Sequence, residues 1–128
     1  MKNIRDDLIY PELSYKLVGI LFDVYNCLGA GHPEKYYQKA ISEELKSREI
    51  SFQEQVYYPL KYKNKIIGQI YLDFLVDNKV VLEIKKNSYF SKKNIDQVLN
   101  YLKLFDKKLA ILANFSKEGV LFKRIVNV

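Results

Sequence analysis

Apolar residues recur at helical spacing in the first third of the chain. Between Glu12 and Leu28 they stand three and four residues apart, which predicts an amphipathic helix. The sequence GAGHP at 29–33 favours an end to this helix and the start of another, which runs from Pro33 to about Arg48. The apolar positions of the first stretch are Leu13, Leu17, Ile20, Leu21, Val24 and Leu28.

The centre of the chain is rich in β-branched and aromatic residues, and turn-like KNK and DNK sequences divide it into three predicted antiparallel strands. These strands lie near 52–62, 66–76 and 80–86. A second helical stripe follows Ser91, which is a plausible N-cap, and ends near Phe105. Two more apolar strands are predicted near 109–115 and 119–126.

The predicted order of elements is ααβββαββ. The helix between the strands near 80–86 and 109–115 has the length of a crossover, which parallel strands require. No repeat, low-complexity segment or linker divides the 128 residues. We therefore expect a single α/β domain over residues 1–128, with a mixed sheet and helices packed against it.

Composition narrows the class of protein. Apolar residues make up 48% of the chain and charged residues 28%, as is ordinary for a globular protein. The net charge of +6 favours polyanionic partners such as nucleic acid. The lone Cys27 excludes an internal disulfide and fits a reducing compartment. No apolar run is long enough for a membrane span, and the charged start lacks the apolar core of a secretion signal. We expect a cytoplasmic protein without membrane contact.

Two acids and a base interrupt the apolar strands in YLDFLVDNKVVLEIKK, residues 71–86. They are Asp73, Glu83 and Lys85, and ionised side chains are rarely buried unless they are paired or bind a metal. Successive strand residues face opposite sides, so Glu83 and Lys85 share one face. The same alternation places Asp73 and Leu75 on one face, opposite Leu72, Phe74 and Val76.

The turn decides whether the two acids meet. A two-residue loop at Asn78-Lys79 pairs position 73 with 84 and puts the acids on opposite faces. A three-residue loop at 77–79, or a single bulge, pairs 73 with 83 and brings the carboxylates together. Asparagine tolerates the left-handed conformation that such a loop needs. The sequence permits both arrangements.

Clustered carboxylates would repel one another unless a cation lay between them. Oxygen ligands favour Mg²⁺ or Mn²⁺, and such a site suits phosphodiester hydrolysis. The alternative is that Asp73 and Glu83 are ordinary solvent-facing residues of a half-exposed sheet, because the spacing between them is short and common.

The spacing D-x9-E-x-K on adjacent strands resembles the PD-(D/E)XK nuclease superfamily. GHPEKYYQKAISEEL resembles the helical signature of its GxxExxY branch, with Gly31, Glu34 and Tyr37 at the signature positions. QVLNY supplies a QxxxY pair at Gln97 and Tyr101. The resemblance covers roughly residues 10–126 and implies a restriction-endonuclease-like αβββαβ core, with a mixed central sheet flanked by helices and an extra helix before it. Leu72 stands where many members have a proline before the first acid.

The resemblance also implies roles for individual residues. Asp73 would be the principal metal ligand and Glu83 the second. Glu34 would be a further acid at the metal, through water. Lys85 would position the nucleophile or stabilise charge, and Gln97 would act beside it in the catalytic set. Residues expected to contact substrate are Tyr101, Lys86, Lys92 and Lys93. Tyr37 is expected to pack behind Glu34, and His32 to be structural or exposed.

Substrate binding is expected to be electrostatic, with DNA favoured over RNA as the partner and a homodimer as one way to grip a duplex. Lysines that could follow phosphates are Lys61, Lys63, Lys65, Lys92, Lys93 and Lys123, together with Arg124. The leading hypothesis is a Mg²⁺-dependent nuclease, with Mn²⁺ as the other candidate ion. The alternative is a non-catalytic module that binds nucleic acid or protein on the same fold.

Overall fold

The computed structural model describes residues 9–127, and the predicted order ααβββαββ is confirmed. The charged start, residues 1–8, lies outside the described residues, so the expectation that it is not a secretion signal stays a prediction. The helices are α1 (Pro11–Leu28), α2 (Glu34–Ser47) and α3 (Lys92–Phe105). The strands are β1 (Phe52–Tyr62), β2 (Lys65–Val76), β3 (Val80–Lys85), β4 (Leu109–Ser116) and β5 (Gly119–Val126).

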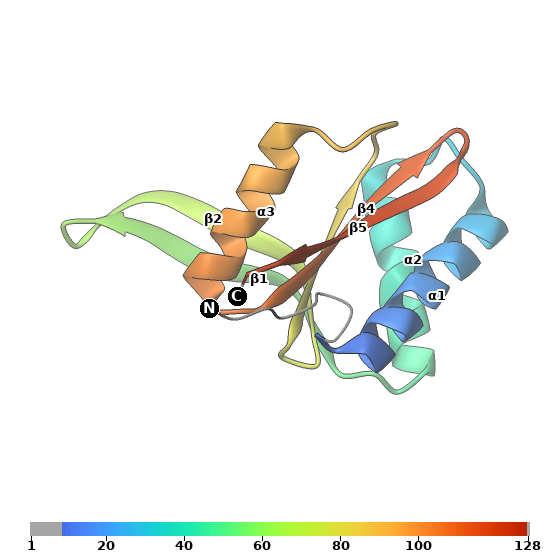
Figure 1. Cartoon of the computed structure of the whole chain (residues 1–128), viewed down its shortest axis with the longest axis horizontal. Helices are drawn as coiled ribbons and strands as arrows, with labels where there is room; N and C mark the ends of the chain where they lie inside the picture. Colours follow the sequence, from blue (N-terminus) through green and yellow to red (C-terminus); the bar gives the residue numbers. More distant parts are fainter. Residues whose placement is uncertain (1–8, 128) are drawn as a thin grey trace, which may run out of the picture.

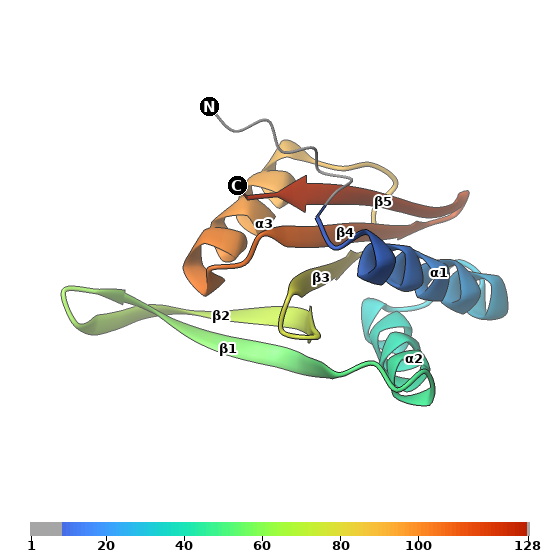
Figure 2. The same cartoon turned by 60° about the horizontal axis from the view of Figure 1, so that its bottom comes forward.

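The five strands form one mixed sheet in the order β1-β2-β3-β4-β5. Only β3 and β4 are parallel, and α3 connects them as the predicted crossover. The other neighbours pair antiparallel. β1 and β2 are longer than the rest of the sheet, so their joined end projects away from the body (Figures 1 and 2).

The sheet separates two apolar cores. On one face α1 and α2 cover the even-numbered positions of β3, including Leu82 and Ile84, as the alternation predicted. On the other face α3 packs Val98 and Leu102 against Val81. β4 is buried along its whole length because helices lie over both of its faces.

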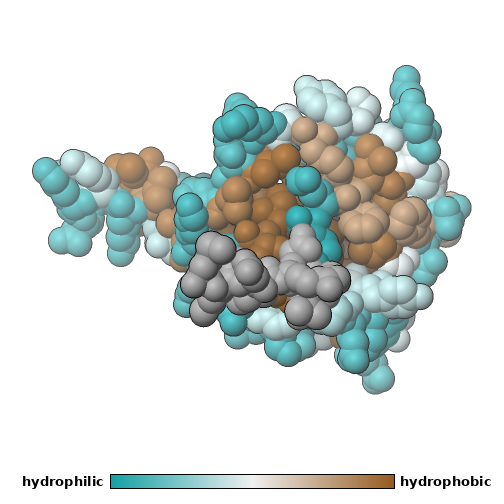
Figure 3. Space-filling model, viewed as in Figure 1, coloured by the Kyte–Doolittle hydropathy of each residue, from teal (hydrophilic) through white to brown (hydrophobic). Residues whose placement is uncertain are grey.

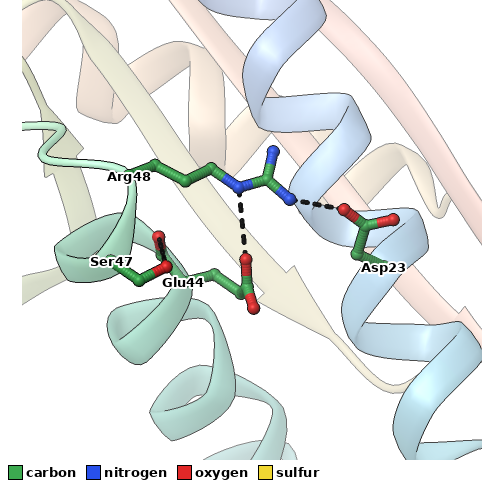
Figure 4. A network of polar contacts seen from close by, with 4 residues as sticks. All are labelled: Asp23, Glu44, Ser47 and Arg48. Carbon is green, nitrogen blue, oxygen red and sulfur yellow. Dashed lines mark hydrogen bonds and ion pairs between the residues drawn. The ribbon is translucent and has the colours of Figure 1, made fainter.

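The connection between α1 and α2 uses two glycines in left-handed conformations, Gly29 (φ 74°) and Gly31 (φ 91°). Further along the same helices, the Arg48 guanidinium donates to the carboxylates of Asp23 and Glu44, which joins the end of α2 to α1 (Figure 4). These three side chains are partly exposed to solvent, so the contribution of this network to stability is about 1 kcal/mol or less.

Helix α3 begins as predicted, with Ser91 as its N-cap: the Ser91 hydroxyl accepts a hydrogen bond from the amide of Asn94 at 3.0 Å. The helix ends at Asp106, which takes a left-handed conformation. Within residues 9–127, no helix is both long enough and apolar enough to cross a bilayer.

Candidate active site

The turn between β2 and β3 brings Asp73 opposite Glu83. Val76 pairs with Val80 and Phe74 with Leu82, and continuing this register by one residue places the two acids side by side. The connection is therefore the three-residue alternative, and the Lys79 amide closes it by donating to the carbonyl of Val76 at 2.9 Å.

Two residues of this turn carry the backbone strain. Asp77 (φ 52°) and Asn78 (φ 54°) are both in the left-handed region, which asparagine and aspartate tolerate better than other side chains. The Lys107 ammonium donates to the carbonyl and to the side chain of Asn78, which holds the turn in place from the end of α3.

The two acids exchange hydrogen bonds with the opposite strand. The Glu83 carboxylate accepts from the backbone amide of Asp73 at 2.7 Å. The Asp73 carboxylate accepts from the backbone amide of Ile84 at 2.8 Å. Each bond occupies one oxygen, Oε2 of Glu83 and Oδ2 of Asp73, and leaves Oε1 and Oδ1 outside these two contacts. The side chains thus take the place of backbone pairing where β2 and β3 separate.

The alternation of β2 side chains between the two faces of the sheet is interrupted at Asp73. Phe74 and Val76 pack under α1 and α2, but Leu72 packs in the α3 core together with Leu75. The expectation that Leu72 would lie on the face opposite Leu75 was therefore wrong, because strict alternation fails between Leu72 and Phe74.

The alternation of β1 side chains between the two faces is also interrupted, at the position across from Asp73. Glu54 accepts a hydrogen bond from Ser42 of α2, whereas Val56 packs in the α3 core. Gln55 between them has φ 49°, a conformation uncommon for a residue other than glycine. Both strands of the hairpin thus reverse their faces beside Asp73.

Burial makes the carboxylate pair unusual. Glu83 is only 2% exposed, and desolvation together with the neighbouring Asp73 raises its pKa to about 8. Desolvation also raises the pKa of Asp73, although the hydrogen bond from Ile84 and the charge of Lys85 act in the opposite direction. A cation between the carboxylates would relieve both penalties, because it favours their charged forms.

Lys85 and Glu34 approach this pair from different elements. Lys85 ends β3, and its charge lowers the pKa of both Asp73 and Glu83. Glu34 is the first residue of α2, and its charge raises the pKa of both. The structure therefore gathers four of the residues singled out in the sequence around one point.

The residues of α3 divide into two groups. Tyr101 is half-buried, and its pKa is raised by burial and by the charges of Glu83 and Asp73, which places it beside the carboxylates. Gln97, one turn earlier, is exposed. Lys86, Lys92 and Lys93 are exposed as well, and Lys92 is already paired with Asp96 at 2.7 Å.

The side chains of Asp73 and Glu83 offer oxygen atoms of the kind that a divalent ion binds. Glu83 is buried and Asp73 half-buried, and each has one carboxylate oxygen outside the two hydrogen bonds, which makes the pair suitable ligands for Mg²⁺ or Mn²⁺. Among residues 9–127, however, no three acid, histidine or cysteine side chains form a ready-made metal cluster. The chemistry of this pair thus fits a divalent ion, which Asp73 and Glu83 would hold.

Tyr37 and His32 are structural, as expected. Tyr37 is buried, donates to the carbonyl of Gly29 at 2.7 Å and stacks on Phe115 with ring centres 4.3 Å apart. His32 contacts the carbonyl of Leu28 through Nε2 at 2.8 Å. Together they fix the turn that precedes Glu34.

Asn114 is a residue that sequence reasoning missed. It lies on β4 at the position paired with Lys85, is fully buried, and donates to the carbonyl of Tyr89 at 2.7 Å. Its Oδ1 has no hydrogen-bond partner among the described residues. The signal in the sequence was a single amide in an otherwise apolar strand, KLAILANF.

A hollow of about 480 Å³ opens at the ends of β3 and β4. Of its lining, Lys86 was expected to contact substrate, but the hollow itself was missed, because its residues come from the end of β4 and from three separate connections. They are Gly31, Lys86, Asn87, Ser88, Phe115, Ser116, Lys117 and Glu118.

Two solved structures share the fold. One is described as the crystal structure of SSO0001, with a TM-score of 0.58 and 18% identity; the match covers 92% of this chain and 60% of that one. This chain therefore spans less than two thirds of that neighbour's length. The other is the alkaline exonuclease LHK-Exo from Laribacter hongkongensis, with a TM-score of 0.50 and 9% identity, covering 90% of this chain and 82% of that one. Identities this low establish the fold alone.

No curated protein sequence matches the chain significantly. The family is instead established by its sequence pattern. Residues 11–125, which span the helices and strands of the described chain except for Val126 at the end of β5, match the PD-(D/E)XK nuclease superfamily. With Asp73, Glu83 and Lys85 gathered where β2 and β3 separate, the sequence and the fold agree: the chain belongs to the PD-(D/E)XK nuclease superfamily.

Proposed function

We propose that this protein is a metal-dependent nuclease that hydrolyses phosphodiester bonds, with Asp73 and Glu83 as the ligands of Mg²⁺ or Mn²⁺. The observation that carries the proposal is the carboxylate pair of buried Glu83 and half-buried Asp73, in which each acid is oriented by a backbone amide of the other strand. Membership of the nuclease superfamily supports it. Gly31, Glu34 and Tyr37 further support a place in the GxxExxY branch.

Each residue has a defined task in hydrolysis. The reaction adds water across one P–O bond: the water oxygen bonds to phosphorus, the bond to the leaving oxygen breaks, and that oxygen takes up a proton. A bound divalent ion would supply Lewis acidity and a more acidic water. Asp73 and Glu83 would hold that ion through their carboxylates, and the burial of Glu83 limits screening of its charge by bulk water.

Lys85 and Tyr101 would contact the reacting phosphate. The Lys85 ammonium can donate to a phosphoryl oxygen or to the attacking water and offset the negative charge that develops. Tyr101 lies beside the carboxylates with its hydroxyl in the neutral, donating form. We assign Glu34 to a water-mediated contact with the ion, and Gln97, Lys86, Lys92 and Lys93 to the substrate path around the site.

The decisive experiment is a cleavage assay on single- and double-stranded DNA and RNA, with Mg²⁺, Mn²⁺ or EDTA. Lys85→Met is compared with Lys39→Met, because Lys39 is an exposed lysine of α2 with no role assigned to it in the site. Metal-dependent cleavage that is lost in Lys85→Met and kept within a few-fold in Lys39→Met supports the proposal. Absence of cleavage on every substrate, or equal activity of both variants, overturns it.

One observation favours a second candidate, a non-catalytic binding module. Within the described residues, no third acid, histidine or cysteine joins Asp73 and Glu83 in a metal cluster. In the same assay this candidate predicts binding of nucleic acid without cleavage under any metal condition. Preference for DNA, a cytoplasmic location and a homodimer stay predictions.

A further inference from the structure

The outer part of the β1–β2 hairpin is an arm that stands apart from the rest of the sheet. We define the arm as residues 56–71. β3 pairs with β2 only at Phe74, Leu75 and Val76, so beyond that point β1 and β2 pair only with each other (Figure 2). At its base the arm touches the body where Tyr58 packs on Phe105 of α3, with ring centres 5.3 Å apart.

The charge of the arm is one-sided. Residues 56–71 contain three lysines and no acid, so the arm carries +3 of the chain's net +6. Lys61, Lys63 and Lys65 are all exposed and cluster about the tip. Lys63 lies over the ring of Tyr62, 5.4 Å from its centre.

Large apolar side chains are exposed among these lysines. Tyr62 is 62% exposed, Ile66 57% and Ile67 65%. Tyr57 and Tyr71 form a ring pair nearer the body and are about half-exposed. Figure 3 shows this mixture of hydrophobic and hydrophilic side chains along the projecting arm. Contiguous exposed apolar residues mark interaction sites, because folding alone gives no benefit from leaving them in water.

We infer that the arm is a nucleic-acid-binding element that holds the substrate on one side of the cut. Its lysines would contact phosphates, and Tyr62 with Ile66 and Ile67 would contact bases or sugars. A second copy of the same arm is an unfavourable binding partner for this surface, because two surfaces that each carry a charge of +3 and no acid repel one another. Charge complementarity thus selects a polyanion.

The geometry links the arm to the carboxylates. Asp73 and Lys65 lie on the same strand, eight residues apart, which corresponds to about 26 Å of extended chain. Along a nucleic-acid strand this distance is roughly eight nucleotides. The link to cleavage rests on the proposed function, whereas binding by the arm does not.

Binding is measured in EDTA, where metal-dependent cleavage is blocked, by fluorescence anisotropy of labelled single- and double-stranded oligonucleotides. The test variant combines Lys61→Ala, Lys63→Ala and Lys65→Ala. The matched control combines Lys16→Ala, Lys39→Ala and Lys103→Ala, which removes three exposed lysines from α1, α2 and α3. We expect the test variant to bind at least 10-fold more weakly and its log–log salt slope to fall by about 2–3. The control is expected to stay within about 3-fold of the unmodified protein in affinity.

A second variant tests the apolar contact. Tyr62→Ser, Ile66→Ser and Ile67→Ser together are expected to weaken binding at least 5-fold without changing the salt slope, because no charge is removed. The control is Tyr15→Ser on α1, which is 82% exposed. Circular dichroism verifies that each variant is folded, which is expected because all of these side chains are exposed.

Three results would overturn the inference. One is that both arm variants bind the oligonucleotides with the same affinity as the unmodified protein. Another is no binding of any oligonucleotide by the unmodified protein. The third is a change in oligomeric state of the lysine variant, by light scattering, with nucleic-acid binding unchanged. Arm-dependent binding without any cleavage in Mg²⁺ or Mn²⁺ would support the inference about the arm and overturn the nuclease proposal.

Discussion

Asp73 and Glu83 are tied to each other through the backbone: the amide of Asp73 donates to the carboxylate of Glu83, at 2.7 Å. The reverse contact runs from Ile84, the residue after Glu83, to the carboxylate of Asp73, at 2.8 Å. Because each acid is held by the strand that carries the other, any movement of β2 relative to β3 would separate the pair. The two carboxylates are thereby positioned by the sheet itself.

Asp73→Asn is expected to abolish metal-dependent cleavage and keep the fold. The asparagine oxygen can still accept from Ile84, but it brings no charge to an ion. Loss of one anionic ligand costs several kcal/mol in a metal site, which is roughly a 100-fold or larger fall in kcat/KM. Cleavage rates of gel-resolved substrates measure the fall.

Asp77→Asn is the matched control for that variant. Asp77 lies four residues away in the exposed turn with φ 52°, which asparagine tolerates, and its partner is Lys79 at 3.6 Å. Activity within about 3-fold of the unmodified protein is expected. An equal loss in both variants would indicate that Asp73 acts through the fold of the hairpin and not through a ligand.

Glu83→Gln is expected to change how stability depends on pH. Burial raises the pKa of Glu83 from 4.5 to about 8 in the folded chain, so the folded chain holds its proton more tightly than the unfolded chain does. Between these two values the free energy of unfolding of the unmodified protein falls as pH rises, by an amount on the order of a few kcal/mol. Glutamine has no proton to lose, so the variant should show a shallower decline.

Urea denaturation at pH 5 to 8.5 in EDTA measures this slope. Glu43→Gln, at an exposed position of α2, serves as the control and should follow the unmodified protein. Since the pKa of Asp73 is raised as well, part of the decline should remain in Glu83→Gln. Parallel curves for Glu83→Gln and the unmodified protein would show that Glu83 is not a buried titrating group.

Tyr37→Phe is expected to destabilise the protein by about 1–2 kcal/mol, because the carbonyl of Gly29 loses its donor inside the structure. This corresponds to a fall in Tm of a few degrees. Tyr36→Phe is the control, since Tyr36 is adjacent but exposed. Differential scanning calorimetry compares the two, and equal Tm values would contradict the role given to the Tyr37 hydroxyl.

Asn114→Ala is expected to loosen the connection between β3 and α3 with little loss of global stability. It removes the bond to the carbonyl of Tyr89, but it also removes an Oδ1 that has no partner among the described residues. Hydrogen exchange at residues 86–91 should accelerate several-fold. Asn127→Ala, which removes an equivalent bond to the carbonyl of Lys107, should leave that segment unchanged.

The elements could be predicted from the sequence because each has a clear periodicity. Strand β1 was predicted at its observed bounds, and the helices to within about one residue. The register that brings Asp73 opposite Glu83 could not be predicted in this way. It depends on left-handed conformations at Asp77 and Asn78, which the sequence permits but does not require.

Other parts of the site depend on contacts between distant segments. The reversal of faces at Asp73 coincides with a left-handed Gln55, and glutamine is not a residue that signals such a conformation. The resemblance placed Gln97 in the catalytic set and Tyr101 among the residues that contact substrate, but their spacing of one helical turn does not show which of them lies nearer the carboxylates. Only the packing of α3 separates them, since it half-buries Tyr101 and leaves Gln97 in solvent.

The short turn at residues 77–79 follows β2 and sets the register of Asp73 relative to Glu83, whereas the arm includes the opposite end of β2. Paired insertions or deletions in the arm therefore leave the distance from the turn to the carboxylates unaltered. Its length and tip chemistry are free to diversify between relatives, or to be exchanged by an engineer, while the carboxylates of Asp73 and Glu83 keep their places.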